Sequence, residues 1–232
     1  MKVVVLGEGD SEGIVLPRLF TAKGLEADEA SIAIVPLGGR HVNHFWRLLS
    51  DLNIPFVTLL DLDLARYRGG WGRIDYVWKQ LEKFTHEVPP MMPTWDDQQN
   101  RLFNIEANPK YINYIADLET KNVFFSSPLD LDFAMVKSYP SAYDVKTTDQ
   151  ITPSESTIKV VLSEHYNGLD QYSENEQKLF NTYQKRFKSN SKPASHLSAL
   201  SKLEDNDLLA NIPPSIERLI DKATEILTGI PE

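Results

Sequence analysis

The chain has 232 residues, of which 41% are hydrophobic, which is enough for one large domain or one domain with a satellite. It contains no cysteine, which excludes disulfides and thiolate zinc sites. No apolar run approaches the ~20 residues that a membrane helix needs, and the N-terminus does not have the pattern of a signal peptide. The net charge of −9 argues, taken alone, against a nucleic-acid partner. We expect a cytoplasmic protein.

The first half of the chain alternates apolar segments with segments of helical spacing. The pattern predicts strands over 2–7, 31–36, 55–60 and 122–126 and helices over 12–23, 41–53, 74–86 and 109–120. Short turns between them are typical of a parallel sheet with right-handed crossovers.

The C-terminal third of the chain is predicted to be helical. Helical patterns run over 154–165, 173–188, 193–203 and 214–229, with loops rich in Ser, Asn and Pro between them.

Residues 87–100 are rich in proline and polar residues and indicate an irregular excursion. We therefore predict an α/β core over 1–138, with a mostly parallel central sheet flanked by helices and with 87–121 as an insert. A helical lobe over 139–232 would pack on it.

Acidic residues follow two of the predicted strands. Glu8 and Glu12 lie at the exit of the first strand and the start of a helix, and Asp61 and Asp63 follow the third strand. In an open α/β sheet, ligands bind at the carboxyl ends of the strands. Asp61 and Asp63 would share a face on a continuing strand, or clamp one ion in a turn. Acids this close together are not all ionised without a counter-charge, and oxygen ligands favour Mg²⁺, Mn²⁺ or Ca²⁺.

A third acidic pair, Asp130 and Asp132, follows the fourth predicted strand. With it the site would have room for two metal ions, an arrangement that suits in-line displacement at phosphorus. Acids after strands are also common as turn formers and helix N-caps. Asp130 is an equally good candidate for capping the helix that begins there.

These motifs resemble a known family. EGDSE at 8–12, Gly38-Gly39 and DLD at 61–63 look like the Toprim domain. The longer segments EGDSEGIVLPRLF, IVPLGG and IPFVTLLDLD resemble the nuclease half of the OLD (overcoming lysogenization defect) family. SSPLDLDFAM and SKPASHLSAL resemble the C-terminal region of that family. The resemblance therefore implies that the α/β core is of the Toprim type.

The resemblance implies a DNA endonuclease that nicks or cleaves with two Mg²⁺ or Mn²⁺ ions, with Ca²⁺ as a non-catalytic substitute. The acids of 8–12 and 61–63 would hold the first metal region, and those of 130–132 would serve the second. A lysine of the helical lobe would stabilise the charge of the transition state. Carried over residue by residue, the predicted site consists of Glu8, Glu12, Asp61, Asp63, Asp130, Asp132 and Lys192.

The resemblance also bears on partners. OLD proteins carry an N-terminal ABC-type ATPase before this region, but this chain has no GxxxxGK[ST] loop. We therefore expect a nuclease region without its ATPase half, and any homo-oligomer is expected to form through that missing half. The family resemblance suggests phage defence or DNA repair.

Two groups of basic and aromatic residues are candidates for DNA contact. The loop after the third strand would reach the DNA backbone beside the metal site, with Trp71 stacking on a base, although an ordinary loop explains it as well. A second group ends a helix, where positive charge also suits the helix dipole. The candidates are Arg66, Arg68, Trp71 and Arg73 in the first group and Lys185, Arg186 and Lys188 in the second. His196, close to Lys192, is interpreted as structural.

Two other functions remain open. A non-catalytic Toprim module would bind metal and DNA, or a partner protein, without cleaving. An aspartyl-phosphate phosphatase or phosphotransferase would use Asp61 as nucleophile, although that chemistry normally has its DxD motif after the first strand. A topoisomerase or primase role has less support, because no tyrosine stands out as a nucleophile and no zinc-binding segment is present.

Overall fold

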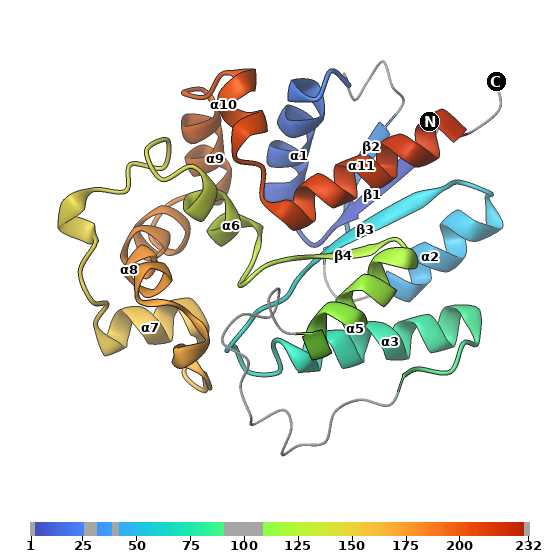
Figure 1. Ribbon diagram of the computed structural model, residues 1–232, viewed down its shortest axis with the longest axis horizontal. Helices are drawn as coiled ribbons and strands as arrows, with labels where there is room; N and C mark the ends of the chain where they lie inside the picture. The colour runs from blue at the N-terminus through green and yellow to red at the C-terminus, as the bar shows by residue number, and fades with distance from the viewer. Residues whose placement is uncertain (1–2, 26–31, 39–41, 91–108, 230–232) are drawn as a thin grey trace.

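A computed structural model describes residues 3–25, 32–38, 42–90 and 109–229 (Figure 1). Gly39, His41 and most of the predicted excursion, residues 91–108, lie outside this part. The centre of the fold is a four-stranded parallel sheet in the order β2-β1-β3-β4, which confirms the predicted α/β class. The strands are β1 (Val3–Gly7), β2 (Ile32–Pro36), β3 (Phe56–Asp61) and β4 (Val123–Ser126).

The two central strands form because their residues are mostly apolar, which suits burial on both faces. Val3 to Leu6 of β1 are at most 1% exposed. Leu6 lies opposite Val35 of β2 and Thr58 of β3, so the three strands run in register to the same edge of the sheet. The acids that follow β1 and β3 therefore emerge side by side.

Helices cover both faces of the sheet, as right-handed crossovers require. The N-terminal helix and the C-terminal helix share one face and are joined by ion pairs from Lys23 to Glu217 and Asp221. The helices are α1 (Asp10–Ala22), α2 (Val42–Asp51), α3 (Trp71–Thr85), α5 (Pro109–Thr120), α6 (Leu131–Ser138), α7 (Glu155–Leu162), α8 (Glu174–Tyr183), α9 (Lys192–Leu200), α10 (Asp205–Ala210) and α11 (Pro214–Gly229). In the described part of the chain, no helix is long and apolar enough to cross a bilayer.

The helical lobe lies beyond the carboxyl ends of the strands, where α7, α8 and α9 gather beside α6 (Figure 1). Phe133 of α6 packs against the rings of Tyr172, Phe180 and Tyr183, which ties α6 to α8. The predicted helix over 173–188 ends at Tyr183 and continues as a π-helical turn. Helix α11 returns to the sheet and packs on β4, β3 and β1. The lobe thus faces the edge of the sheet that carries the acids.

Candidate metal centre

The carboxyl ends of β1 and β3 open into an acidic cavity of about 510 Å³. Its wall comes from the turn after β1, the end of β3, the start of α6 and the start of α9. The structure therefore brings together most of the predicted metal-binding residues, but Asp63 is not among the residues that line the cavity. The predicted site residues that line it are Glu8, Glu12, Asp61, Asp130, Asp132 and Lys192.

The turn after β1 folds Glu12 back over the strand end. A Cβ atom on Gly7 would lie 2.6 Å from the Cβ and Cγ of Glu12, so only glycine fits at this position. The backbone N–H of Gly9 donates to Glu12 Oε2 at 3.0 Å. Glu12 is only 4% exposed as a result. The four-residue spacing from Glu8 to Glu12 thus places both carboxylates at the carboxyl end of β1, where they line the cavity.

Asp61 is fixed by the neighbouring strand ends. It lies opposite Ser126 in the β3–β4 register, and the Ser126 hydroxyl donates to Asp61 Oδ1 at 2.8 Å. The backbone N–H of Asp61 donates to Glu8 Oε1 at 3.3 Å, which links the ends of β1 and β3. Sequence reasoning missed Ser126, although a polar residue that ends the neighbouring strand is a detectable signal.

Glu12 and Asp61 are acids whose charged forms are disfavoured in the metal-free protein. Burial, with added repulsion from Asp132 and Glu8, raises the pKa of Glu12 to about 7. Burial and the neighbouring carboxylates of Asp130 and Glu8 raise the pKa of Asp61 well above its usual value. Within the described ranges, neither side chain forms an ion pair. This arrangement is suited to an added positive charge.

The raised pKa of Glu12 predicts that the metal-free protein loses stability as pH rises. The folded state holds a proton that the unfolded state, with a pKa near 4.5, releases. The stabilisation is full below that value and is lost as pH rises through the folded pKa of about 7. We expect the free energy of unfolding in urea to fall by about 3 kcal/mol across this window.

The matched control for this pH dependence is Glu12→Gln, which keeps an oxygen for the Gly9 N–H but does not titrate. Its unfolding free energy should depend less steeply on pH than that of the wild type. Equal slopes for the two proteins would contradict the assignment. Because metal ligands must be deprotonated, added Mn²⁺ should bind more tightly as pH rises through the same range.

Asp63 does not line the cavity. Strand β3 ends at Asp61, and Asp63 adopts a left-handed conformation with φ of 54°, so the two acids neither share a strand face nor clamp one point. Arg66 Nη1 lies 2.6 Å from Asp63 Oδ1, and Arg73 Nε lies 3.3 Å from Asp63 Oδ2. Arg73 also forms an ion pair with Glu8. Two arginines thus neutralise part of the predicted acidic cluster.

The loop that carries these arginines is folded inward. A Cβ atom on Gly69 would lie 1.7 Å from the carbonyl oxygen of Asp63, so the loop closes tightly on the strand end. Arg73 is 3% exposed, and Trp71 is 7% exposed with its ring edge-on to Tyr114 at 5.1 Å. Neither reaches the surface where DNA would lie. The sequence pattern did not reveal this inward turn.

The other candidates for DNA contact are placed as follows. Arg66 donates to the carbonyl of Val161 and to the Tyr183 hydroxyl, so it also points into the protein. Lys185 and Arg186 form ion pairs with Asp149 and Asp144. Arg68 and Lys188 are exposed, each beside a tyrosine ring. DNA contact by these residues stays a prediction.

Asp130 caps α6 and lines the cavity at the same time. Its Oδ1 accepts the N–H of Phe133 at 2.9 Å, as expected for an N-cap. Its Oδ2 accepts the Tyr183 hydroxyl at 2.5 Å and lies 3.3 Å from Arg66 Nη2. Burial and the charge of Asp132 raise the pKa of Asp130. The structural and the chemical interpretations of this residue are therefore compatible.

Asp132 contacts three donor side chains. Lys192 Nζ lies 2.5 Å from its Oδ2, while Ser11 Oγ donates to Oδ1 at 2.6 Å and His196 Nε2 lies 2.9 Å from the same oxygen. Burial opposes ionisation, but the His196 hydrogen bond and the Lys192 charge hold the pKa of Asp132 well below its usual value. The ion pair with Asp132 thus holds Lys192, a residue of the helical lobe, at the cavity.

The carboxylate oxygens of the cavity are suitable ligands for a hard divalent ion, but they do not form a ready-made site in the metal-free protein. Among the described side chains, no three acids or histidines are grouped as a ready-made metal site. The physical reason is that cations already hold Glu8 and Asp132. Glu12 and Asp61, by contrast, offer oxygen ligands that have no counter-charge, which suits Mg²⁺ or Mn²⁺.

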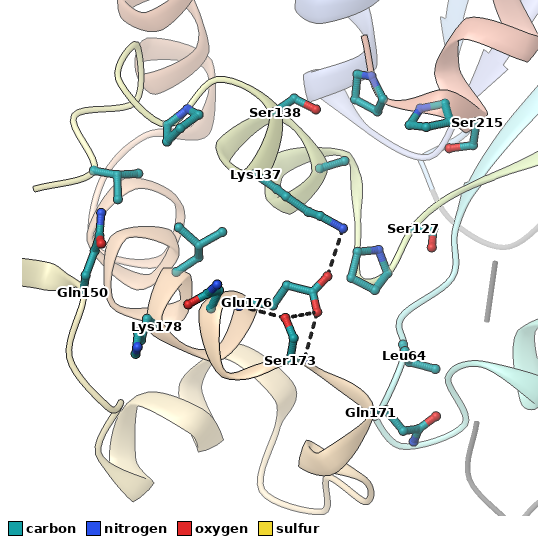
Figure 2. A pocket seen from close by; sticks show the side chains of 18 residues that line it. Leu64, Ser127, Lys137, Ser138, Gln150, Gln171, Ser173, Glu176, Lys178 and Ser215 are labelled. Atoms are coloured by element: carbon teal, nitrogen blue, oxygen red, sulfur yellow. Dashed lines mark hydrogen bonds and ion pairs between the residues drawn. The ribbon is translucent and has the colours of Figure 1, made fainter. Parts of the chain in front are cut away.

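A larger cavity, of about 790 Å³, lies elsewhere, along α6 and α8 (Figure 2). Figure 2 shows Lys137 and Glu176 pointing toward each other across it, at 2.9 Å. Glu176 also accepts from Ser173 in the capping box of α8, so it has a structural role. This cavity lacks a group of acids, and its greater size does not make it the chemical site.

Comparison with known proteins identifies the first part of the chain. Residues 1–63 match the family model for the Overcoming lysogenization defect protein-like, TOPRIM domain. This first part of the chain is therefore similar to an OLD-like Toprim domain. Toprim domains generally bind divalent metal ions, which agrees with the oxygen-rich cavity. No curated protein matches the chain.

Solved structures extend the likeness over nearly the whole chain. The C-terminal region of the Xanthomonas campestris pv. campestris OLD protein is 16% identical, with a TM-score of 0.56 and 96% of each chain covered. The C-terminal region of the Burkholderia pseudomallei OLD protein is 15% identical, with a TM-score of 0.56, covering 97% of this chain and 98% of that one. The predicted resemblance to OLD C-terminal regions is confirmed at the level of the fold.

Proposed function

We propose that the protein is a divalent-metal-dependent DNA endonuclease. The observation that carries the proposal is the cavity at the ends of β1 and β3, where the uncompensated Glu12 and Asp61 face a lysine from another part of the chain. The OLD-like Toprim match supports the same class of function. DNA carries negative charge, as the protein does, but bound cations would offset part of the charge at the site.

The residues of this chain would have the following roles in the reaction. Glu8, Glu12, Asp61 and Asp130 would hold two Mg²⁺ or Mn²⁺ ions, which when bound supply an activated water and stabilise the leaving oxygen. Ser126 and the backbone of β3 keep Asp61 at the edge of the cavity. Binding would require Glu8 to exchange its ion pair with Arg73 for the metal, and Glu12 to release a proton.

Lys192 would act on the substrate directly. Its side chain is 43% exposed and lines the same cavity as Asp61. A fixed ammonium at this place would stabilise the charge that develops on the phosphoryl oxygens in the transition state. Asp63 is not part of this proposal, because it does not line the cavity and each of its carboxylate oxygens contacts an arginine.

The test is the conversion of supercoiled plasmid to nicked or linear DNA by the purified protein. We expect cleavage with Mn²⁺ or Mg²⁺, none after the ions are removed by a chelator, and little with Ca²⁺. Plasmid that stays intact with Mn²⁺ at every protein concentration would overturn the catalytic proposal for this chain.

A non-catalytic Toprim module is the second candidate. The observation in its favour is that arginines hold Glu8 and Asp63 in the metal-free chain, which makes metal binding less favourable. DNA or partner binding would then be the function, and an ATPase half of the OLD type is the expected partner. Retention of DNA in a gel-shift experiment with Mn²⁺, without any strand cleavage, would favour this candidate.

A further inference from the structure

The larger cavity, of about 790 Å³, lies between α6 and α8 beside the start of α11 (Figure 2). A cavity of this size between helices is typical of sites for small molecules. It shares no lining residue with the acidic cavity, because α6 contributes its first residues to one and Lys137 and Ser138 to the other. A molecule bound in the larger cavity would therefore be separate from the metal centre.

The start of α11 offers hydrogen-bond donors to this cavity. The helix begins at Pro214, which has no N–H. The N–H groups of Ile216 and Glu217 both donate to the carbonyl of Pro213 at 2.9 Å. Ser215 lies between them, and neither its N–H nor its hydroxyl is bonded to any residue that the structure describes.

Ser215 is only 4% exposed, yet it lines the cavity. Buried polar groups are normally hydrogen-bonded, so an unpartnered hydroxyl at a cavity wall points to a missing partner. The N-terminus of a helix carries a partial positive charge, which favours an anion at this place. The group that would satisfy Ser215 is therefore a negatively charged acceptor.

The charged side chains of the cavity favour the same kind of ligand. Two lysines and one glutamate line it, in a chain whose net charge is −9. Both oxygens of Glu176 are already occupied, one by Lys137 at 2.9 Å and the other by the N–H of Ser173 at 2.8 Å. Lys178 forms no ion pair with a described residue. Because an ammonium has three N–H donors, Lys137 can keep Glu176 and still donate to an anion.

We propose that the larger cavity binds a small phosphorylated molecule of the mononucleotide class, with its phosphoryl group held by Ser215 and Lys137. The phosphoryl oxygens would accept from the Ser215 N–H and hydroxyl and from the ammonium. The apolar side chains of Leu64 and Leu179 line the same cavity and suit the face of a base. This proposal does not rest on the nuclease function, because none of these residues lines the metal centre.

The first test follows the Ser215 N–H in ¹H–¹⁵N spectra while the protein is titrated with inorganic phosphate or adenosine monophosphate. A chelator is present throughout, so that no divalent ion can hold either probe at the acidic cavity. We expect the Ser215 signal to shift with both probes and to saturate at a lower concentration of the nucleotide. A Ser215 signal that moves with neither probe would overturn the proposal.

The second test measures nucleotide binding to variants by calorimetry. Lys137→Met should weaken binding by about 10-fold or more, as loss of a charge-assisted hydrogen bond does. The Lys137 side chain is 50% exposed, so this variant should fold. Lys79→Met is the matched control, because Lys79 is also an exposed lysine with one acidic partner, and it should bind as the wild type does. Wild-type affinity in Lys137→Met would contradict the assignment.

Two further comparisons decide where the anion binds and what carries it. Lys192→Met should bind the nucleotide as tightly as the wild type, because Lys192 lines the acidic cavity instead. Loss of binding in Lys192→Met but not in Lys137→Met would place the anion at the metal centre and overturn the proposal. A single-stranded oligonucleotide without terminal phosphates should leave the Ser215 signal unchanged. A shift with the oligonucleotide and none with the nucleotide would show that DNA, and not a small molecule, occupies the cavity.

Discussion

Asp61→Asn is expected to remove divalent-ion-dependent cleavage almost completely. The loss should exceed about 100-fold in kcat, because even the outer partners of metal ligands typically contribute 10- to 100-fold. Asp61 lines the cavity, is held by Ser126 and is adjacent to Glu8, and it has no ion-pair partner in the described part of the chain. Mn²⁺ binding measured by calorimetry should weaken together with cleavage.

The same substitution should leave the fold intact. The raised pKa of Asp61 means that its ionised form is unfavourable in the metal-free protein, so an uncharged amide relieves repulsion and still accepts the Ser126 hydroxyl. We expect an unchanged or higher Tm at neutral pH. Asp51→Asn, the same change at an exposed position at the end of α2, is the matched control and should alter neither cleavage nor Tm. A folded Asp61→Asn protein with full activity would contradict the site.

The strands of the sheet could be predicted because each is determined by a short segment of the sequence. Each strand is a short apolar run with a turn signal at its end, and burial on both faces of a parallel sheet needs nothing more. Helix ends were harder to predict. The helix after Ser154 stops at Leu162 because Ser163 adopts a φ of 86°, and no residue pattern announces that change. Helix α10 was missed because it is short and carries little apolar periodicity.

The candidate site could be predicted only in part. Glu8, Glu12 and Asp61 were found because each follows a recognisable strand end. The partners of these acids come from distant parts of the chain: Glu8 pairs with Arg73 and Asp61 with Ser126, each 65 residues away. Composition suggested a DNA surface in the loop rich in arginine, but it did not show that Arg66 and Arg73 of this loop pair with acids.

Lys192→Met is expected to lower kcat by about 100- to 1,000-fold, the range found when one preorganised charge-stabilising donor is removed. Methionine keeps much of the length of the side chain but has no ammonium. Asp132 would keep Ser11 and His196 as donors, so the local structure should persist. Mn²⁺ binding should be unchanged, because the lysine is not a ligand.

That separation of binding from turnover is the decisive feature of the Lys192 variant. A ligand such as Asp61 should lose both properties, whereas a residue that acts only on the transition state should lose turnover alone. Lys178→Met is the matched control: it makes the same change in the larger cavity along α6 and α8 and should leave cleavage unaffected. If Lys192→Met cleaves at the wild-type rate, the ammonium has no part in the reaction. Its ion pair with Asp132 then serves only to join α9 to α6.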